Sequence, residues 1–422
     1  MSSRIQRLAT SLFLIWLVAL GLRVGFLVHQ VRLIPAEVLA TVPFENEVGS
    51  VAQSLAQGHG FCCLFRQPTG PTAWLTPVYP LLLASIFKMF GIFTFASFLA
   101  AALLNCVFSS LICIPIFRAG RRIAGVPVTA LGAWIWAFFP SGIVMPFEWI
   151  WDTSLSALVA AILLWATIVF DESFTSRNAT GYGLLWGFAL LTNPALGALF
   201  PFLLGWAAYR PYRQRRLRPG RILLALALAF VVCAPWTIRN AIRFHRLIPL
   251  RSNFAFELWR GNNESFDEYS REVNRITRFE QVRLYAQLGE TAFLEEKMQK
   301  AKAFLRAHPA LALQLWGRRI VATWFGTEDP WTSFSRADSL LVRFILGWNA
   351  LTFLGLFIGL ARLLAARNSY VLPLAVYPII YPLVYYLTQT SLRLRHPCDP
   401  VLALFLAIAV LGAHGQPLQP DA

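Results

Sequence analysis

Apolar segments about as long as a bilayer is thick recur along this chain and restrict its fold more than any other feature. A helix needs about 20 consecutive apolar residues to cross the hydrocarbon core. Backbone polar groups inside a bilayer must be satisfied within the chain, which favours helices. We therefore predict an all-α fold, a polytopic transmembrane helical bundle with about ten spans. The approximate spans are 9–28, 95–117, 124–144, 152–170, 179–193, 195–209, 222–238, 340–361, 369–388 and 399–414.

The composition agrees with a membrane protein and bears on its partners. The chain is 57% hydrophobic and 14% charged, whereas a soluble domain has about 25% charged residues. Its 37 Lys and Arg against 21 Asp and Glu give a formal net charge of +16. In a soluble protein this balance would indicate nucleic-acid binding. Here we assign it to cytoplasmic loops and to binding of anionic lipid or phosphate, so we expect membrane lipids and no nucleic acid as partners.

Basic residues follow alternate spans, and this pattern predicts the topology. All of these residues lie on one side of the membrane if the N-terminus is cytoplasmic, as the positive-inside rule requires. The first span lacks a small-residue cleavage site, so we interpret it as an uncleaved anchor. The basic groups are Arg4 and Arg7 before the first span, Arg118, Arg121 and Arg122 after the second, the 209–221 run after the sixth, and Arg362 and Arg367 after the eighth.

Two long segments then face the outer side. The first outer loop covers about 29–94, and its residues 80–90 predict a short interfacial or re-entrant helix. The second covers 239–339, where residues 278–307 predict an amphipathic helix and 309–325 a further helix. We divide the chain into an N-terminal transmembrane core, 1–238, an outer region, 239–339, and C-terminal transmembrane helices, 340–422.

Candidate acidic groups lie on this outer side. Glu45 and Glu47 follow the first span, and either could serve as a general base or a metal ligand, or be an ordinary solvated carboxylate. Their spacing of two places them on different faces of a helix, so they do not form a dyad there. Glu148 and Asp152 flank the connection between the third and fourth spans. Asp152 is a catalytic candidate, with N-capping of the fourth span as the alternative.

Basic residues on the outer side run against the positive-inside trend. Arginine suits bidentate contacts with phosphate, so we predict two clusters that bind a lipid-linked phosphate, with headgroup anchoring as the alternative. We further assign an acceptor- or sugar-binding role to His59, Trp74, Tyr79 and Asn262. The predicted phosphate ligands are Arg239, Arg243 and His245 in one cluster and Arg393, Arg395 and His396 in the other.

The six cysteines are too scattered to form a disulfide framework. Three of them lie in apolar helices, where we expect ordinary buried residues: Cys106, Cys113 and Cys233. A bridge from Cys398 to Cys62 or Cys63 is left open.

Four stretches carry a resemblance to a known family. They are the acidic loop with Glu45, Glu47 and SLAQGHGF, the segment TAWLTPVYPLLLASIFKMFG, PWTIRN with the later RGNN, and LRLRHPCDP before the last span. Their order resembles integral-membrane glycosyltransferases of the C superfamily, close to family 39. That family includes protein O-mannosyltransferases and bacterial lipid A aminoarabinose transferases.

The resemblance implies an enzyme of the bacterial inner membrane with its active site outside. Such an enzyme transfers a hexose or pentose, with inversion, from a polyprenyl-phosphate carrier to a lipid, glycan or protein acceptor. An acidic residue of the first loop acts as base, and basic residues hold the phosphate. Several members use a divalent metal such as Mg or Mn, but no ligand cluster stands out in this sequence.

The chain departs from the better-known members in its first loop. Their signature is often Asp-Glu followed by an aromatic residue, and here Phe44-Glu45 and Val48 stand in that register. We prefer Glu47 as base because it is closer to the following helical segment, with Glu45 in reserve. The alternatives are a lipid-linked-sugar flippase or transporter and a non-catalytic lipid-sugar-binding protein. The lack of an internal repeat weakens the transporter hypothesis.

Overall fold

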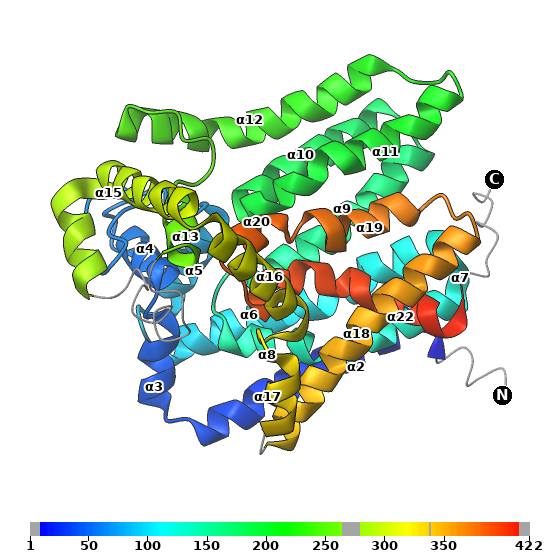
Figure 1. Cartoon of the computed structure of the whole chain (residues 1–422), viewed down its shortest axis with the longest axis horizontal. Coiled ribbons are helices and arrows are strands. Elements are labelled where there is room, and N and C mark those ends of the chain that lie inside the picture. Colours follow the sequence, from blue (N-terminus) through cyan, green and yellow to red (C-terminus); the bar gives the residue numbers. More distant parts are fainter. Residues whose placement is uncertain (1–8, 264–278, 337–338, 413–422) are drawn as a thin grey trace.

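The computed structural model describes residues 9–263, 279–336 and 339–412. These residues fold into helices and connecting loops (Figure 1). Within the described ranges the only β-type pairing is an isolated antiparallel bridge between Cys62 and Pro71. The all-α prediction is therefore confirmed for this part of the chain.

The first half of the chain forms the blue-to-green helices of Figure 1. Its helices are α2 (Leu12–Leu33), α3 (Ala36–Thr41), η1 (Val42–Phe44), α4 (Glu47–Ala56), α5 (Val78–Phe90), α6 (Phe95–Leu111), α7 (Cys113–Ala137), α8 (Pro140–Glu148), α9 (Thr153–Glu172), α10 (Ser176–Thr192), η2 (Pro194–Leu199) and α11 (Phe200–Arg213).

The second half begins with a long helix that crosses the predicted boundary at residue 238. Its helices are α12 (Pro219–Phe244), α13 (Phe254–Gly261), α15 (Phe279–Ala307), α16 (Pro309–Phe325), α17 (Pro330–Arg336), α18 (Leu340–Ala365), α19 (Val371–Ile380), α20 (Leu383–Leu387), α21 (Leu392–Arg395), η3 (His396–Cys398) and α22 (Asp399–Leu411).

Six helical stretches in the described residues are long and apolar enough to cross a membrane. The predicted count of ten spans is not confirmed. The segments expected at 95–117 and 124–144 belong to one stretch, Phe95–Glu148, and three others fold into shorter or interrupted helices. Asn193 ends α10, and its side chain accepts from the Ala195 amide at 3.1 Å, so the chain turns there instead of continuing. The six stretches are Leu12–Leu33, Phe95–Glu148, Thr153–Glu172, Pro219–Phe244, Leu340–Ala365 and Leu392–Leu411.

The core of the bundle is built around α22, which packs against α7 and α18. Close approach of these helices depends on small residues. At Gly359 of α18, an added Cβ would lie 2.4 Å from the Phe405 carbonyl oxygen of α22. Arg23, fully buried in α2, donates to Ser109 Oγ at 2.8 Å and to the Ala137 carbonyl at 3.1 Å. These bonds satisfy the buried charge and join α2 to α6 and α7.

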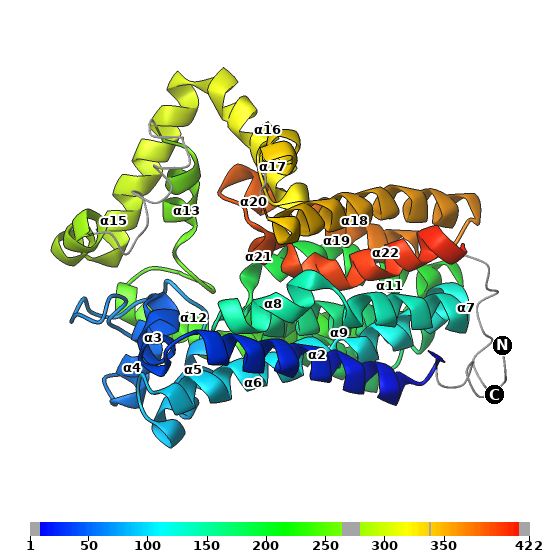
Figure 2. The same cartoon turned by 90° about the horizontal axis from the view of Figure 1, so that it is seen from below.

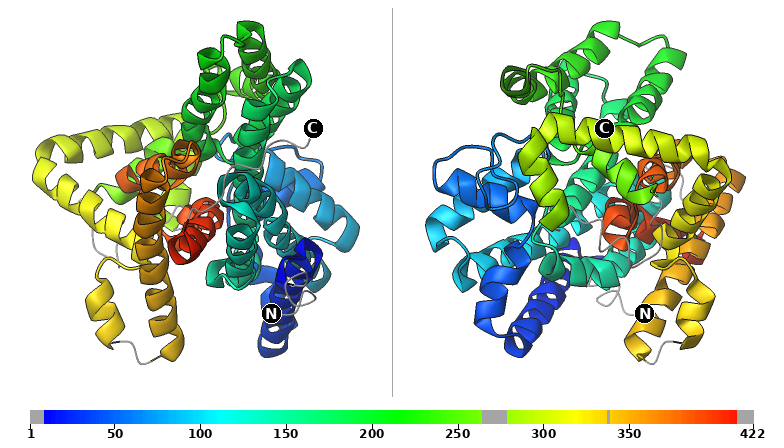
Figure 3. Two further views of the ribbon diagram at one scale, coloured as in Figure 1. Left: turned by 90° about the vertical axis from the view of Figure 1, so that its right-hand side faces the viewer. Right: turned by 60° about the vertical axis from the view of Figure 1, so that its left-hand side comes forward.

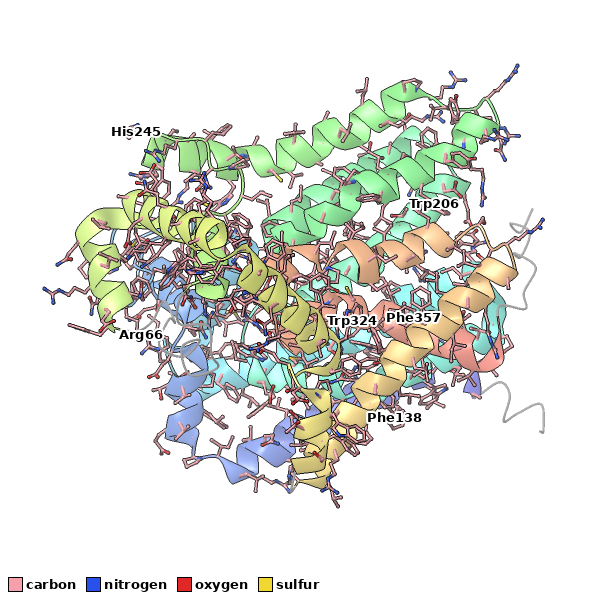
Figure 4. The ribbon with its side chains drawn as sticks, in the orientation of Figure 1. Arg66, Phe138, Trp206, His245, Trp324 and Phe357 are labelled. Carbon is pink, nitrogen blue, oxygen red and sulfur yellow. The ribbon has the colours of Figure 1, made fainter. Side chains whose placement is uncertain are left out.

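The Arg-rich connections meet at one end of the bundle. Asn368 donates to the Ile123 carbonyl at 2.8 Å, and Trp206 donates to the Ser369 carbonyl at 3.0 Å. Arg210 pairs with Asp171 at 3.2 Å. Figure 4 shows Trp206 toward this end and Arg66 and His245 toward the other. The basic connections therefore share one end, as the positive-inside pattern predicts, and the side of the membrane on which they lie stays a prediction.

The opposite end carries the helices of the two long outer segments. There α15 and α16 form a bent arm that projects beyond the helices of the bundle (Figures 2 and 3). The helices expected at 278–307 and 309–325 are present as α15 and α16, and residue 278 lies outside the described residues. The short helix expected at 80–90 is α5. Their placement at a membrane interface is not confirmed, because no membrane is present.

Candidate active site

Glu47 is the first residue of α4, and local contacts fix its position. The Asn46 side chain caps the helix by accepting from the Gly49 amide at 2.9 Å, and it donates to the Pro43 carbonyl at 2.8 Å. Gly49 allows the tight entry, because an added Cβ would lie 2.1 Å from the Phe44 carbonyl oxygen. Glu47 is half-buried at this turn, whereas Glu45 is exposed.

Asp152 occupies the N-cap position of α9 but does not make the expected cap bond. Its carboxylate instead accepts from Ser156 Oγ at 3.0 Å, and its carbonyl accepts from the Ser156 amide at 2.7 Å. Two arginines on other elements, Arg393 and Arg251, lie close enough to influence the pKa of this carboxylate. The N-capping alternative does not account for this geometry.

Arg393 lies in α21 between two indole rings. Its guanidinium carbon is 4.2 Å from the centre of the Trp149 ring and 4.8 Å from that of Trp151. These cation–π contacts hold the charge without using its N–H donors. One terminal nitrogen, Nη1, is buried and has no hydrogen-bond partner among the described residues. A buried guanidinium with a free donor is prepared for an anionic ligand.

A third carboxylate, Glu257 in α13, completes the cluster and was not predicted from the sequence. It accepts from Gln389 Nε2 at 2.6 Å and from Asn253 Nδ2 at 3.1 Å. Arg251 in turn donates to Asn253 at 2.6 Å. In the sequence, Glu257 was marked only by its position in the NFAFELWRGNNE stretch, which carries no spacing motif.

These groups influence one another electrostatically. Removal from water raises the pKa of Glu47, and the charge of Glu257 raises it further, while Arg393 and Arg260 act in the opposite direction. Removal from water also raises the pKa of Asp152, against the effects of Arg393 and Arg251. Perturbed carboxylates beside a cationic group are typical of functional sites. The structure thus brings Glu47, Asp152 and Arg393 together from three distant parts of the chain.

A cavity of about 760 Å³ opens beside Arg393. Its wall is formed by the end of α8 with Trp149, by α16, α17 and the connection between them, and by α21 with the segment before it. Its polar lining has more carboxylates than cations and many hydroxyl groups. The carboxylates are Glu148, Glu328 and Asp329, and the hydroxyl residues are Thr327, Thr332, Ser333, Thr390 and Ser391.

The basic cluster predicted at 239–246 lies elsewhere. Arg239 donates to the carbonyls of Phe61 and Thr72, both at 2.7 Å, and stacks 4.9 Å from the Trp236 ring centre. It therefore anchors the first outer loop to α12. Arg243 and His245 are exposed at the end of that helix. No described contact joins these three residues to Arg393, so the structure does not unite the two predicted basic clusters.

Arg395 and His396 require a correction. Arg395 is buried and donates to Asp399 at 2.9 Å and to the Trp324 carbonyl at 2.7 Å. His396 Nδ1 lies 3.1 Å from both Asp399 Oδ2 and Ser141 Oγ. These contacts join neighbouring elements of the bundle, and neither side chain lines the cavity. Of the predicted cluster, only Arg393 is available to a phosphate.

The predicted acceptor-binding residues do not gather around the cavity either. Trp74 is buried against Phe256, 5.2 Å between ring centres. Tyr79 is buried and donates to Asn105 at 3.1 Å. Asn262 is buried and donates to the Leu387 carbonyl at 2.8 Å, and His59 is exposed. Tyr79 and Asn262 have their polar groups satisfied inside the protein, and Trp74 packs among aromatic rings.

The proposed bridge from Cys398 is not present. Cys398 is fully buried in the bundle, where its thiol contacts the Tyr377 carbonyl at 3.2 Å. Cys62 and Cys63 are half-buried in the first outer loop, and all six cysteines are free. Cys106, Cys113 and Cys233 are buried as expected.

Comparison with solved structures places this architecture among known folds. The chain matches no protein-family model and no curated protein sequence. It is similar to archaeal oligosaccharyltransferase AglB from Archaeoglobus fulgidus in complex with an inhibitory peptide and a dolichol-phosphate, with a TM-score of 0.54 and 14% identity over 96% of this chain. A second structure of the Archaeoglobus enzyme, tethered to an acceptor peptide containing the NVT sequon, gives a TM-score of 0.55 and 13% identity over 97% of this chain.

The chain therefore shares the fold of these oligosaccharyltransferase structures. It spans about half the length of these neighbours, covering 50% and 49% of the two chains. A third neighbour was solved as a complex with Zn and sulfate. In the described part of this chain, no three His, Cys, Asp or Glu residues converge on a point that could hold a metal ion. A divalent metal such as Mg or Mn therefore stays a prediction.

Proposed function

We propose that this protein is a membrane glycosyltransferase that moves a sugar from a polyprenyl-phosphate carrier to an acceptor at the end of the bundle opposite the Arg-rich connections. The observation that carries the proposal is the Arg393 guanidinium, held between Trp149 and Trp151 with a buried, unpartnered N–H, beside Glu47 and Asp152. The fold supports it, since neighbours of this fold transfer lipid-linked glycans. One of them binds a dolichol-phosphate.

The chemistry assigns a task to each side of this cluster. The acceptor oxygen attacks the anomeric carbon of the sugar, and the bond from that carbon to the phosphate oxygen breaks. The phosphate leaves with the electron pair, and its added negative charge falls beside Arg393, which stabilises it. The acceptor proton passes to Glu47, the proposed general base. A single displacement of this kind inverts the anomeric configuration.

The electrostatics of the cluster favour Glu47 as that base. A general base works best when its pKa lies near the working pH, and burial together with Glu257 raises the pKa of Glu47 toward that range. When the donor phosphate binds Arg393, it neutralises a charge that otherwise lowers this pKa. Donor binding would thus strengthen the base just before transfer. Asp152, the largest charge influence on Arg393, would keep the guanidinium in position.

The cavity beside Arg393 would hold the transferred sugar. Its hydroxyl and carboxylate groups suit the many donors and acceptors of a sugar ring, and Trp149 offers an aromatic face. Three carboxylates in the lining against one guanidinium disfavour an anionic sugar. We therefore propose a neutral or positively charged glycosyl group, and we leave the acceptor, whether lipid, glycan or protein, unassigned.

The grouping of the basic connections supports a bacterial inner-membrane location with a cytoplasmic N-terminus, following the positive-inside rule. The cluster of Glu47, Asp152 and Arg393 would then face the periplasm. This placement agrees with a carrier lipid and membrane lipids as the partners of the site. The variants Arg118→Cys and His245→Cys, each made in a protein whose native cysteines are replaced, test this placement. In whole cells a membrane-impermeant maleimide should label the His245→Cys variant and leave the Arg118→Cys variant unlabelled.

The decisive experiment is Glu47→Gln in proteoliposomes with labelled polyprenyl-phosphate sugars. We expect transfer to fall by about 10²-fold or more, the usual contribution of a general base, while carrier binding persists. Glu45→Gln is the matched control, because Glu45 is exposed two residues earlier and should retain activity. Unchanged transfer by Glu47→Gln would reject the assignment of the base. Carrier movement or binding by wild type without any transfer would instead favour a flippase, a transporter or a non-catalytic binding protein.

The pH profile gives an independent test of the same base. Transfer should decline as the pH falls through the raised pKa of Glu47, which lies above 4.5. Because Glu257 raises this pKa and Arg260 lowers it, Glu257→Gln should move the acidic limb to lower pH and Arg260→Gln should move it to higher pH. Shifts in the same direction for both variants would contradict the proposed coupling.

A further inference from the structure

Cys62 and Cys63 form an adjacent pair of thiols that the proposed transfer reaction does not use. They lie in the loop between α4 and α5 and are half-buried, whereas the other four cysteines are buried in helices. The loop folds back on itself here. The Cys63 amide donates to the Gly70 carbonyl at 3.1 Å, and Cys62 pairs with Pro71 in an isolated antiparallel β-bridge.

The Cys62 thiol contacts a side chain of α4. Cys62 Sγ lies 3.0 Å from Ser54 Oγ, and Ser54 Oγ also donates to the Gly60 carbonyl at 3.0 Å. Cys62 and Ser54 are also among the groups that influence the pKa of the Cys63 thiol. Both thiols of the pair therefore have Ser54 of α4 as a neighbour.

The backbone at this pair departs from the ordinary conformations of a dipeptide. Adjacent Cα atoms are about 3.8 Å apart, closer than the about 4.4–6.8 Å usual for a disulfide, so an ordinary dipeptide resists closure of the ring. Cys63 has a φ of 65°, in the left-handed region that few non-glycine residues adopt. Strained disulfides have high reduction potentials and are the labile, regulatory ones.

We propose that Cys62 and Cys63 are a redox-active vicinal dithiol, which closes to a disulfide by exchange with a disulfide-bearing oxidant. The thiolate of Cys62 attacks one sulfur of the oxidant and releases its other half as a thiol. The thiolate of Cys63 then attacks the Cys62 sulfur and releases the second half. The pair loses two electrons and two protons, and the oxidant disulfide becomes two thiols.

The surroundings of the pair determine which thiol attacks first, and they connect the pair to helix α4. Burial raises the pKa of Cys63, so Cys63 is the poorer first nucleophile and acts as the resolving thiol. The pair is also connected to the helix that carries Glu47, because Ser54 belongs to α4. In the same loop, Arg66 donates to the Phe44 carbonyl at 3.1 Å, just before that helix. The proposal does not depend on the transfer reaction.

The test uses the intact protein in detergent, treated with oxidised glutathione, quenched with N-ethylmaleimide and cleaved with trypsin. Cleavage after Arg32 and Arg66 gives one peptide, residues 33–66, that contains Cys62 and Cys63 and no other cysteine. We expect this peptide to lose two hydrogens and to carry no adduct, and to accept two maleimides after reduction. Cys62→Ser should leave Cys63 largely alkylated by maleimide, and Cys63→Ser should stop at the mixed disulfide with glutathione.

The same sample contains its own controls. The peptide with Cys398 should remain reduced, because that thiol is fully buried. Phenylarsine oxide, which bridges two close thiols, should bind wild type and neither single variant. The proposal is overturned if the native peptide stays fully alkylatable, or if it carries glutathione in place of the internal disulfide. Equal yields of the disulfide from native and SDS-denatured protein would also overturn it, because the loop would then not prepare the pair.

Discussion

Glu290 offers the sharpest test of how the outer loops are held together. Its buried carboxylate receives four donors from three segments: Ala73 N–H at 2.9 Å, Ser252 Oγ at 2.7 Å, Tyr285 Oη at 2.7 Å and Thr72 Oγ1. Burial and the adjacent carboxylate raise the pKa of Tyr285, so its hydroxyl stays protonated and donates. One side chain thus fastens the first outer loop and the α12–α13 connection to α15.

Removal of the Glu290 carboxylate should lower the free energy of local opening of the loop, by an amount that follows from these contacts. In Glu290→Ala, the Ala73 amide and the Tyr285 hydroxyl lose the acceptor that the structure gives them. Each unsatisfied buried group costs about 1–3 kcal/mol, so we expect local opening of the loop to become easier by about 4 kcal/mol. That change corresponds to a rise of about 10²–10³-fold in the population of the open loop. Glu290→Gln should cost about 1 kcal/mol, because the hydroxyl groups of Thr72 and Tyr285, which both contact Oε2, can rotate and accept from its amide.

Hydrogen exchange followed by mass spectrometry measures this opening directly. Exchange in peptides that cover Ala73 and Ser252 should accelerate strongly in Glu290→Ala and weakly in Glu290→Gln, with α9 and α22 unchanged. Glu295→Ala is the matched control on the same helix, since its ion pair with Arg246 is exposed and worth under about 1 kcal/mol. Acceleration of less than about tenfold in Glu290→Ala would refute the reasoning. Equal acceleration throughout the bundle would show global unfolding instead of local opening.

Three further predictions concern the cluster and its supports. Arg393→Lys should weaken binding of a polyprenyl phosphate and Arg393→Ala should weaken it more, by about tenfold or more in a fluorescence binding assay, because lysine keeps the charge but not the planar fork; equal affinities for all three proteins would contradict a phosphate role. Gly49→Ala should expose the α4 region to protease while the bundle stays folded, because its Cβ would meet the Phe44 carbonyl at 2.1 Å; wild-type resistance would show that the turn adapts. Arg395→Met should destabilise the protein by about 3–5 kcal/mol in a detergent unfolding assay, because the buried Asp399 would lose its guanidinium partner, and the double variant with Asp399→Leu should recover stability if that explanation holds.

The sequence predicted the class of fold well and its details less well. Long apolar runs such as 9–28 and 222–238 correspond to α2 and α12, because a bilayer sets a minimum length that few soluble helices need. The count of ten spans is not confirmed, because several predicted spans correspond to shorter helices. Asn193-Pro194 lies between two of the predicted spans, where α10 ends after 17 residues and the helix η2 begins.

The candidate site shows a different limit. Glu47 and Asp152 stood out in the sequence because carboxylates beside apolar runs need a reason, and the structure brings both to Arg393. Glu257 did not stand out, because it is one acidic residue in a short helix, α13, whose sequence carries no spacing motif. Arg393, Arg395 and His396 are nearly consecutive, and their sequence pattern is that of one basic cluster. Only the turn of α21 into η3 shows that they point to different partners.

What the sequence alone determined is therefore set by short-range physics. The length and hydrophobicity of the apolar runs predicted a helical membrane protein. The positions of the arginines predicted that the basic connections lie at one end of the bundle. The tertiary structure decided which charges face one another, because a buried side chain takes its role from the donors and acceptors that distant segments bring to it. Arg239 and Arg395 became structural when backbone carbonyls and Asp399 satisfied their donors. Arg393 remained free for an anion because two indole rings surround it and satisfy none of its N–H groups.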